Sequence, residues 1–327
     1  MQQKIAFEEH CAVEETLEET RAFAGESASF SHFTRQILDL GNERLEGMDR
    51  NGIELAILSL NAPGVQAILD TQRAIAVANK GNDRMAEAVT RHPKRYAALA
   101  ALPMQDPDAA AAELTRCVKM GFVGAMVNGF TQKDVPDSAI YYDQPEYRSF
   151  WATVAELDVP LYLHPRMQIP SRAQNYQGHP WLMSAPWGFG VETSIHALRL
   201  CGSGLFDQYP KLQIVLGHLG ECIPFGLWRL DARMRFSPRG YRGRRPLGEY
   251  FRQNFHLTTS GNFNDPAFRC TLDVMGRDRV YFSADYPFET MDDAAGWFDS
   301  STVINEAERT KIGRTNASKL FKLDDKR

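Results

Sequence analysis

The sequence predicts a single (β/α)8 TIM barrel, amidohydrolase-like in its organisation, that spans residues 1–327. Three observations predict this fold class: short aliphatic runs recur along the chain, segments of helical periodicity separate them, and no linker rich in Gly, Ser or Pro divides the chain. Most runs are continuously apolar, as strands buried on both faces are. Barrels of this kind commonly exceed ~250 residues as one domain, so a length of 327 residues fits.

Eight runs are expected to form the barrel strands. They lie at residues 4–7, 54–60, 96–102, 123–127, 160–163, 212–216, 255–259 and 280–283. A doubly wound open sheet is the structural alternative. It is disfavoured because neither a G-x-G-x-x-G motif nor a P-loop follows any run.

The intervening segments carry recognisable helix signals. Asp106 precedes Pro107 at a first helical position, Leu114 and Val118 share a face, and Gly121 follows the end. Two more helices are expected on similar grounds, at residues 143–157 and 265–276.

Composition restricts the class of partner. With 37 Lys plus Arg against 41 Asp plus Glu, the formal net charge is -4, which gives no global electrostatic reason to expect nucleic acid or an anionic membrane. No apolar run approaches the ~20 residues of a membrane span, and the N-terminus meets charge before it could build a signal-peptide core. The five cysteines are scattered without a Cys-x-x-Cys pair, so a disulfide framework is not expected. We therefore expect a cytoplasmic protein with a small-molecule ligand.

Polar residues follow four of the eight runs, where catalytic groups of a barrel stand. The four strand ends read Glu8-Glu9-His10, His164-Pro165-Arg166, Gly217-His218-Leu219-Gly220-Glu221 and Ser283-Ala284-Asp285. Each such residue alone is more often structural, but their shared placement favours a site. The other histidines, at positions 32, 92, 179, 196 and 256, lack this placement and are interpreted as surface or structural residues.

Alternation along an extended segment predicts that Glu8 and His10 point into the barrel mouth together, while Glu9 points away toward a salt bridge or solvent. With His164 and Asp285 they offer two nitrogens and two oxygens. Such a set suits one divalent ion such as Zn, Mn or Mg.

These strand ends also carry a resemblance that covers essentially the whole chain. The chain resembles the decarboxylase branch of the amidohydrolase superfamily, and above all the gamma-resorcylate (2,6-dihydroxybenzoate) decarboxylases, with 2,3-dihydroxybenzoate and salicylate decarboxylases as near relatives. The matching segments are residues 8–10, 60–66, 127–130, 163–166, 217–221, 258–262, 282–289, 311–317 and 320–323.

The resemblance implies one divalent metal ion per subunit and no organic cofactor. The implied ligands are Glu8, His10, His164 and Asp285, with His218 and Glu221 beside the metal. Hydrolytic members usually carry His-x-His on the first strand and a bridging carbamylated lysine on the fourth. Here Glu8-x-His10 and Asn128 occupy these places, which favours decarboxylation over hydrolysis.

The implied reaction is the non-oxidative, reversible decarboxylation of an ortho-hydroxybenzoate. Protonating the ring carbon that bears the carboxylate avoids an aryl anion, and loss of CO2 then restores aromaticity. Asp285 is the implied proton donor, and His218 paired with Glu221 would orient the substrate and shuttle the proton. The alternative makes His218 itself the acid.

Further residues are candidates for substrate contact. Arg229 matches a substrate-binding arginine of the family and would meet the carboxylate, in its own or a neighbouring subunit's pocket, or it is a surface residue. Phe23, Phe189 and Phe288 would sandwich the ring or simply pack in the core. Asn128 completes the set. The aromatic acid is the expected partner, and the resemblance implies a homo-oligomer, either dimer or homotetramer.

Two features leave alternatives open. Seven arginines occur from Arg229 to Arg245, both included, and a subunit-interface loop or solvent accounts for them better than nucleic acid does. The tyrosine at position 286 resembles the 2,3-dihydroxybenzoate decarboxylases, whereas Glu8-Glu9-His10 resembles the gamma-resorcylate decarboxylases. The choice of substrate among these acids therefore stays open.

Two other functions compete with decarboxylation. One is a mononuclear metal-dependent hydrolase or hydratase on the same barrel. The other is a barrel that binds an aromatic acid, or another protein, without catalysis.

Overall fold

The computed structural model describes residues 3–20 and 27–323. Within them, eight strands make one sheet whose order follows the chain, β1-β2-β3-β4-β7-β8-β9-β10. The bounds of these strands are β1 Lys4–Cys11, β2 Ile53–Leu60, β3 Tyr96–Ala101, β4 Gly124–Asn128, β7 Leu161–His164, β8 Ile214–Leu216, β9 Phe255–Thr258 and β10 Val280–Tyr281. All paired neighbours in this sheet run parallel. The predicted (β/α)8 barrel, nearly closed, is confirmed.

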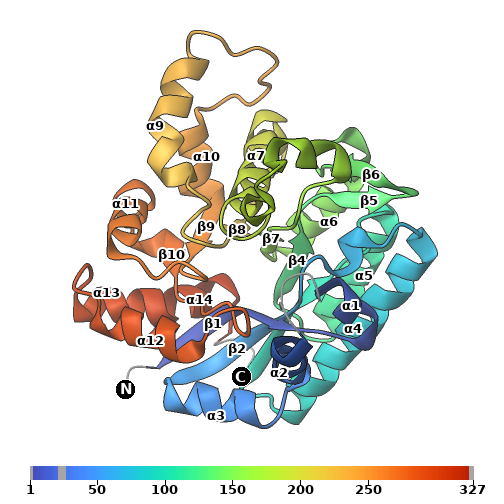
Figure 1. The fold of residues 1–327 in the computed structure, drawn as a ribbon. Helices are drawn as coiled ribbons and strands as arrows, with labels where there is room; N and C mark the ends of the chain where they lie inside the picture. Colours follow the sequence, from blue (N-terminus) through green and yellow to red (C-terminus); the bar gives the residue numbers. More distant parts are fainter. Residues whose placement is uncertain (1–2, 21–26, 324–327) are drawn as a thin grey trace.

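Helices surround the barrel and join its strands (Figure 1). The α-helices are α1 Glu14–Thr20, α2 Ser27–Leu38, α3 Glu43–Arg50, α4 Thr71–Arg91, α5 Pro107–Lys119, α6 Arg148–Leu157, α7 Gly188–Gly202, α8 Leu205–Gln208, α9 Ile223–Met234, α10 Leu247–Asn254, α11 Asp265–Met275, α12 Met291–Ser300, α13 Glu306–Thr310 and α14 Asn316–Leu320. The expected cap of α5 is confirmed, since Asp106 accepts hydrogen bonds from the amides of Asp108 and Ala109. The helix expected over 143–157 begins later, at Arg148, after a 3-10 turn at Pro145–Tyr147. A short hairpin of β5 Thr131–Lys133 and β6 Val135–Ile140 was not anticipated.

Strands β1 and β10 close the barrel without forming a backbone ladder in the described sheet. One backbone hydrogen bond joins β1 to the segment that follows β10, from the His10 amide to the Tyr286 carbonyl at 2.8 Å. Side chains supply the rest. Ser283 Oγ accepts from the amide of Glu8 at 2.7 Å, and Glu9 Oε1 accepts from the amide of Ala284 at 3.0 Å. We call these contacts the β1–β10 seam.

The barrel interior is polar at its mouth and apolar at the opposite end. Ile5, Phe7 and Tyr162 belong to an interior apolar cluster that also contains Phe321 from beyond α14. Between Ala6 and Glu9, β1 contains one residue more than its partner β2, since Ala6 pairs with Ala56 and Glu9 with Leu58. This irregularity shifts the alternation of the strand by one position, so Phe7 and Glu8 both face the interior.

Among the described helices, none combines the length and the apolar composition that crossing a bilayer requires.

Candidate active site

Four side chains from three strand regions converge at the mouth of the barrel. Glu8 and His10 come from β1, His164 ends β7, and Asp285 follows β10. One ligand atom from each lies within 4.8 Å of the others, and all four residues are buried. The closest approaches are 3.1 Å between His10 Nε2 and Asp285 Oδ1, and 3.2 Å between His164 Nε2 and Glu8 Oε1.

The polar atoms that face this space suit a cation. Glu8 Oε1, His10 Nε2 and Asp285 Oδ1 are buried and have no hydrogen-bond partner among the described residues. Buried polar atoms without a partner are costly, so a ligand at their point of convergence accounts for them. Two imidazole nitrogens and two carboxylates can hold one divalent ion of the Mn, Mg or Zn type.

The imidazoles are held so that each presents Nε2 to the centre. His164 Nδ1 lies 2.9 Å from the Pro165 carbonyl, to which it can only donate, so Nε2 keeps its lone pair. Burial lowers the pKa of His164, which favours the neutral form that a metal requires. His10 Nδ1 lies 3.1 Å from Ser59 Oγ. Both rings are therefore oriented by the contact that Nδ1 makes on the side away from the centre.

His218 and Glu221 lie on a strained loop beside the four ligands. His218 Nδ1 is 2.5 Å from Glu221 Oε1, while its Nε2 is 3.7 Å from Glu8 Oε1 and 3.6 Å from Asp285 Oδ2. Burial opposes protonation of His218, but the charges of Glu221 and Glu8 outweigh it and raise its pKa well above the usual range. His218, Glu221 and Asp285 all have positive φ, at 52°, 56° and 75°. Such backbone strain is concentrated at functional sites.

The expectation for Glu9 was wrong in part. It does point away from the four-residue centre, but it is fully buried and reaches neither solvent nor a salt bridge among the described residues. Its Oε1 accepts hydrogen bonds from Ser283 Oγ at 3.2 Å and from the Ala284 amide. Burial raises the pKa of Glu9 to about 8.

The residues suggested for substrate contact are placed unevenly. Asn128 ends β4 beside His164 in register, and its buried Oδ1 has no partner among the described residues. The Phe288 ring packs edge-on against His10 at 5.4 Å between centroids. Phe189 is half-buried in the first turn of α7. Phe23 lies outside the described residues.

Arg229 is exposed on α9 and does not belong to the four-residue centre. It lines a cleft of about 420 Å3 between α7 and α9, together with Glu221 and Cys222. The cleft connects the region of Arg229 with that of Glu221.

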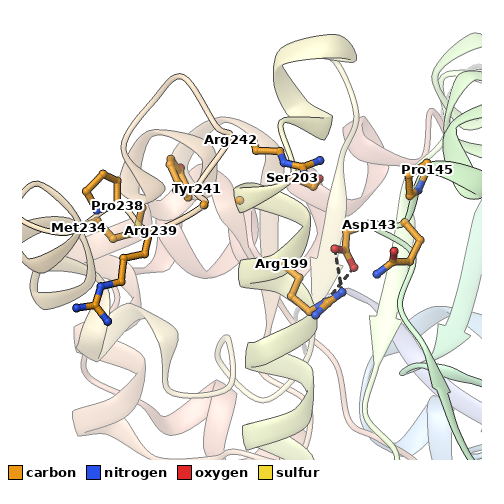
Figure 2. Close-up of a pocket in the computed structure, with 12 residues that line it drawn as sticks. Asp143, Pro145, Arg199, Ser203, Met234, Pro238, Arg239, Tyr241 and Arg242 are labelled. Carbon is orange, nitrogen blue, oxygen red and sulfur yellow. Dashed lines mark hydrogen bonds and ion pairs between the residues drawn. The ribbon is translucent and has the colours of Figure 1, made fainter.

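Of the other arginines in this stretch, Arg233 lines the same cleft as Arg229. Arg239 and Arg242 line a separate cleft of about 650 Å3 on the outer side of α7 (Figure 2). Arg199 projects into it and is held by Asp143 through two hydrogen bonds of 2.9 and 3.0 Å. This cleft contains none of the residues assigned to chemistry.

Sequence reasoning missed the hydroxyl groups beneath the centre. Tyr162, Thr258 and Ser260 all hydrogen-bond Glu8 Oε2. The signal was available, since Tyr162 lies two positions before His164, and Thr258 and Ser260 are two apart at the end of β9. The alternation that placed Glu8 and His10 on one side of β1 also applies to the ends of β7 and β9, where it indicates these three residues.

Comparison with known proteins now identifies the family. A match to the amidohydrolase family spans residues 38–323, most of the chain. This chain belongs to the amidohydrolase family. Within that family, it is 50% identical to the gamma-resorcylate decarboxylase of Rhizobium radiobacter over 328 residues, which cover 99% of each chain. It is 51% identical to the one from Rhodococcus jostii over 330 residues, covering 99% of this chain and all of that one.

Solved amidohydrolase structures agree with this placement. A 2,6-dihydroxybenzoate decarboxylase complexed with 2,6-dihydroxybenzoate superposes with a TM-score of 0.96 at 50% identity, over 98% of this chain and 100% of that one. The dihydroxybenzoic acid decarboxylase of Polaromonas, which contains manganese and the inhibitor 2-nitroresorcinol, also gives a TM-score of 0.96 at 50% identity, over 99% and 98% of the two chains.

Proposed function

We propose that this amidohydrolase is a divalent-metal-dependent carboxy-lyase that reversibly decarboxylates an ortho-hydroxybenzoate, with 2,6-dihydroxybenzoate as the first choice. The observation that carries the proposal is the convergence of four buried ligand atoms at the barrel mouth, three of them without hydrogen-bond partners in the described chain. The names of relatives that are 50% identical over 99% of the chain support the substrate class.

Glu8, His10, His164 and Asp285 would hold the metal. When bound, the ion would attract the phenolate and carboxylate oxygens of the acid and withdraw charge from them. The residues of the chain then have to orient the ring and supply one proton. That proton forms a new C–H bond at the carboxyl-bearing ring carbon, the bond to the carboxylate breaks, its electron pair returns to the ring, and CO2 leaves.

Asp285 is the proposed donor, with His218 and Glu221 as its source of protons. A gap of 3.6 Å between His218 Nε2 and Asp285 Oδ2 suits relay between them. The raised pKa of His218 favours an imidazolium that can release a proton. This charge state also supports the variant of the scheme in which His218 is itself the acid.

Arg229 is the proposed cation for the substrate carboxylate, because it lines the same cleft as Glu221. Phe288, which packs against His10, is a candidate wall for the ring, and Asn128 offers its unpartnered Oδ1 to a substrate hydroxyl. Phe189 is a further candidate for contact with the ring, as is Phe23, which lies outside the described residues.

The protein is further proposed to be a homo-oligomer built through α9. Phe225, Trp228 and Phe236 are 87%, 78% and 82% exposed on this helix or just after it. Exposed aromatic residues gathered in one region are typical of protein interfaces. A second copy is the simplest partner, since a symmetric pair buries the same patch twice.

A reducing, cytoplasmic location is proposed as well. Its support is that all five cysteines are free, three of them in the buried interior.

A substrate panel tests the proposed activity. Metal-loaded protein is incubated separately with 2,6-dihydroxybenzoate, 2,3-dihydroxybenzoate and salicylate, and absorbance loss is followed together with release of CO2. We expect 2,6-dihydroxybenzoate to give CO2 and its phenolic product, resorcinol, in equal amounts. Turnover of another acid alone would correct the substrate, while stoichiometric metal without any CO2 would leave a hydrolase, a hydratase or a binding protein.

A further inference from the structure

The two oxygens of Glu8 have different surroundings. Oε2 accepts hydrogen bonds from the hydroxyls of Tyr162 and Ser260, and from Thr258 Oγ1 at 3.3 Å. Oε1 has no hydrogen-bond partner in the described chain and lies 3.2 Å from His164 Nε2. One oxygen is therefore committed to the protein, and the other faces the site.

The three hydroxyl groups of Tyr162, Thr258 and Ser260, here called the hydroxyl cradle, lie against one another. Tyr162 OH lies 2.9 Å from Thr258 Oγ1, which lies 2.8 Å from Ser260 Oγ. All three residues are fully or almost fully buried, so solvent cannot replace a lost hydrogen bond. Ser260 Oγ also accepts from the His218 amide at 3.2 Å, which ties the cradle to the strained loop.

Gly217 leaves room for this arrangement. A Cβ atom at this position would lie 2.8 Å from Glu8 Oε2 and 3.0 Å from Ser260 Oγ. Both distances are shorter than ordinary contacts of a methyl group. The glycine before His218 is thus explained by the space that Glu8 and Ser260 occupy.

We propose that the hydroxyl cradle positions Glu8 as a one-oxygen ligand of the divalent ion. A free carboxylate can bind a metal through one or both oxygens, and Ca2+ accepts two-oxygen binding readily, whereas smaller ions such as Mg2+ favour compact octahedral sites. With its acceptor sites occupied by hydroxyl donors, Oε2 is withheld from the ion. The cradle thereby keeps coordination positions open for substrate and selects against larger ions.

The inference rests on the proposed function in taking Glu8 as a metal ligand, so it is tested by metal binding and not by turnover. Tyr162→Phe, Ser260→Ala and the double variant are prepared metal-free, and equilibrium dialysis gives the dissociation constants for Mn2+ and for Ca2+. Outer hydrogen-bond partners of metal ligands typically affect affinity by ~10- to 100-fold. We expect each single variant to bind Mn2+ with ~10-fold lower affinity, and the double variant to bind it more weakly still.

Selectivity separates positioning from simple loss of structure. Releasing Oε2 permits two-oxygen binding, so Ca2+ affinity should fall less than Mn2+ affinity, and the ratio of the two dissociation constants should move toward Ca2+. Tyr281→Phe is the matched control, because it removes a buried barrel hydroxyl that bonds His256 Nδ1 at 2.6 Å instead of Glu8. It should leave both affinities unchanged.

If Tyr162→Phe and Ser260→Ala have the same dissociation constants for Mn2+ and for Ca2+ as the wild type, the proposed role of the cradle is overturned, while the proposed activity is untouched. Parallel loss of both ions, with an unchanged ratio, would also overturn it. Conversely, a shifted ratio in a protein that decarboxylates no panel acid would support the cradle and contradict the proposed function. Thermal unfolding of each variant identifies any that fails to fold, and the second single variant then decides.

Discussion

Glu8 and Glu9 are adjacent acids, both fully buried, with opposite electrostatic surroundings. Burial opposes ionisation of both. For Glu8 the charge of His218 and the close approach of His164 outweigh burial and lower the pKa below its usual range. For Glu9 burial prevails and raises the pKa to about 8, although the Ala284 amide partly offsets it. One acid is therefore held as a carboxylate and the other keeps its proton near neutrality.

This difference predicts a pH-dependent stability of the metal-free protein. The folded-state pKa of Glu9 lies above the ordinary 4.5, so between 4.5 and about 8 the folded state binds a proton that the unfolded chain has released. Stability should fall as pH rises through this window, by up to ~1.4 kcal/mol per pH unit. Urea denaturation of wild type and Glu9→Gln across the window measures it. The variant should lack this part of the slope, and identical slopes would show that Glu9 is ionised in the folded protein.

Substitutions can separate the role of a metal ligand from that of the proton donor. His164→Ala removes a ligand atom and should lose most of its bound metal, whereas Asp285→Asn keeps an oxygen ligand and should retain metal while losing nearly all turnover. Metal analysis and CO2 release measure the two effects. Full metal occupancy in His164→Ala would remove His164 from the ligand set.

At the scale of elements, continuous apolar runs indicated the eight parallel strands, because both faces of each strand are covered. They could not indicate the irregularity in β1, which lies in the pairing of Ala6 and Glu9 with β2 and leaves no mark in hydrophobicity. Strict alternation from Ile5 and Phe7 would have put Glu9 in the barrel instead of Glu8. Alternation from His10 back to Glu8 stays valid, because the irregularity lies before Glu9 and leaves Glu8 and His10 on the same side.

The sequence likewise could not indicate the β1–β10 seam, because nothing distinguishes Ser283 from an ordinary strand residue. Ser283 Oγ accepts from the buried amides of Phe7, at 3.2 Å, and Glu8. Ser283→Ala leaves both without a partner, at about 1–3 kcal/mol each, so we expect a loss of roughly 2–6 kcal/mol in unfolding free energy. Urea denaturation measures it, with the exposed Ser300→Ala as control. A change below that of the control would mean that the seam adds no stability.

In the whole molecule, α9 and the loop that follows it project outward from the barrel, whereas α10 packs against β9 (Figure 1). The exposed aromatic residues on α9 supply the apolar core that an interface needs, and each buried aromatic side chain contributes ~150–250 Å2. No sequence pattern separated these positions from core aromatics, because helical spacing is the same for both.

The oligomer is tested by a double substitution on this helix. Phe225→Ser with Trp228→Ser should lower the mass in sedimentation or light scattering to that of a smaller species, because the apolar contact is lost. Val135→Ser, at a residue 56% exposed on β6, is the control and should keep the wild-type mass. An unchanged mass in the double variant would place the interface elsewhere.

One divalent ion, held by Glu8, His10, His164 and Asp285, is proposed to enable decarboxylation. Titrating Mn2+ into metal-free protein, while CO2 release from 2,6-dihydroxybenzoate is followed, tests this proposal. We expect no activity without metal, a linear rise and a plateau at one ion per chain. Full turnover in metal-free protein, or a plateau at two ions per chain, would contradict it.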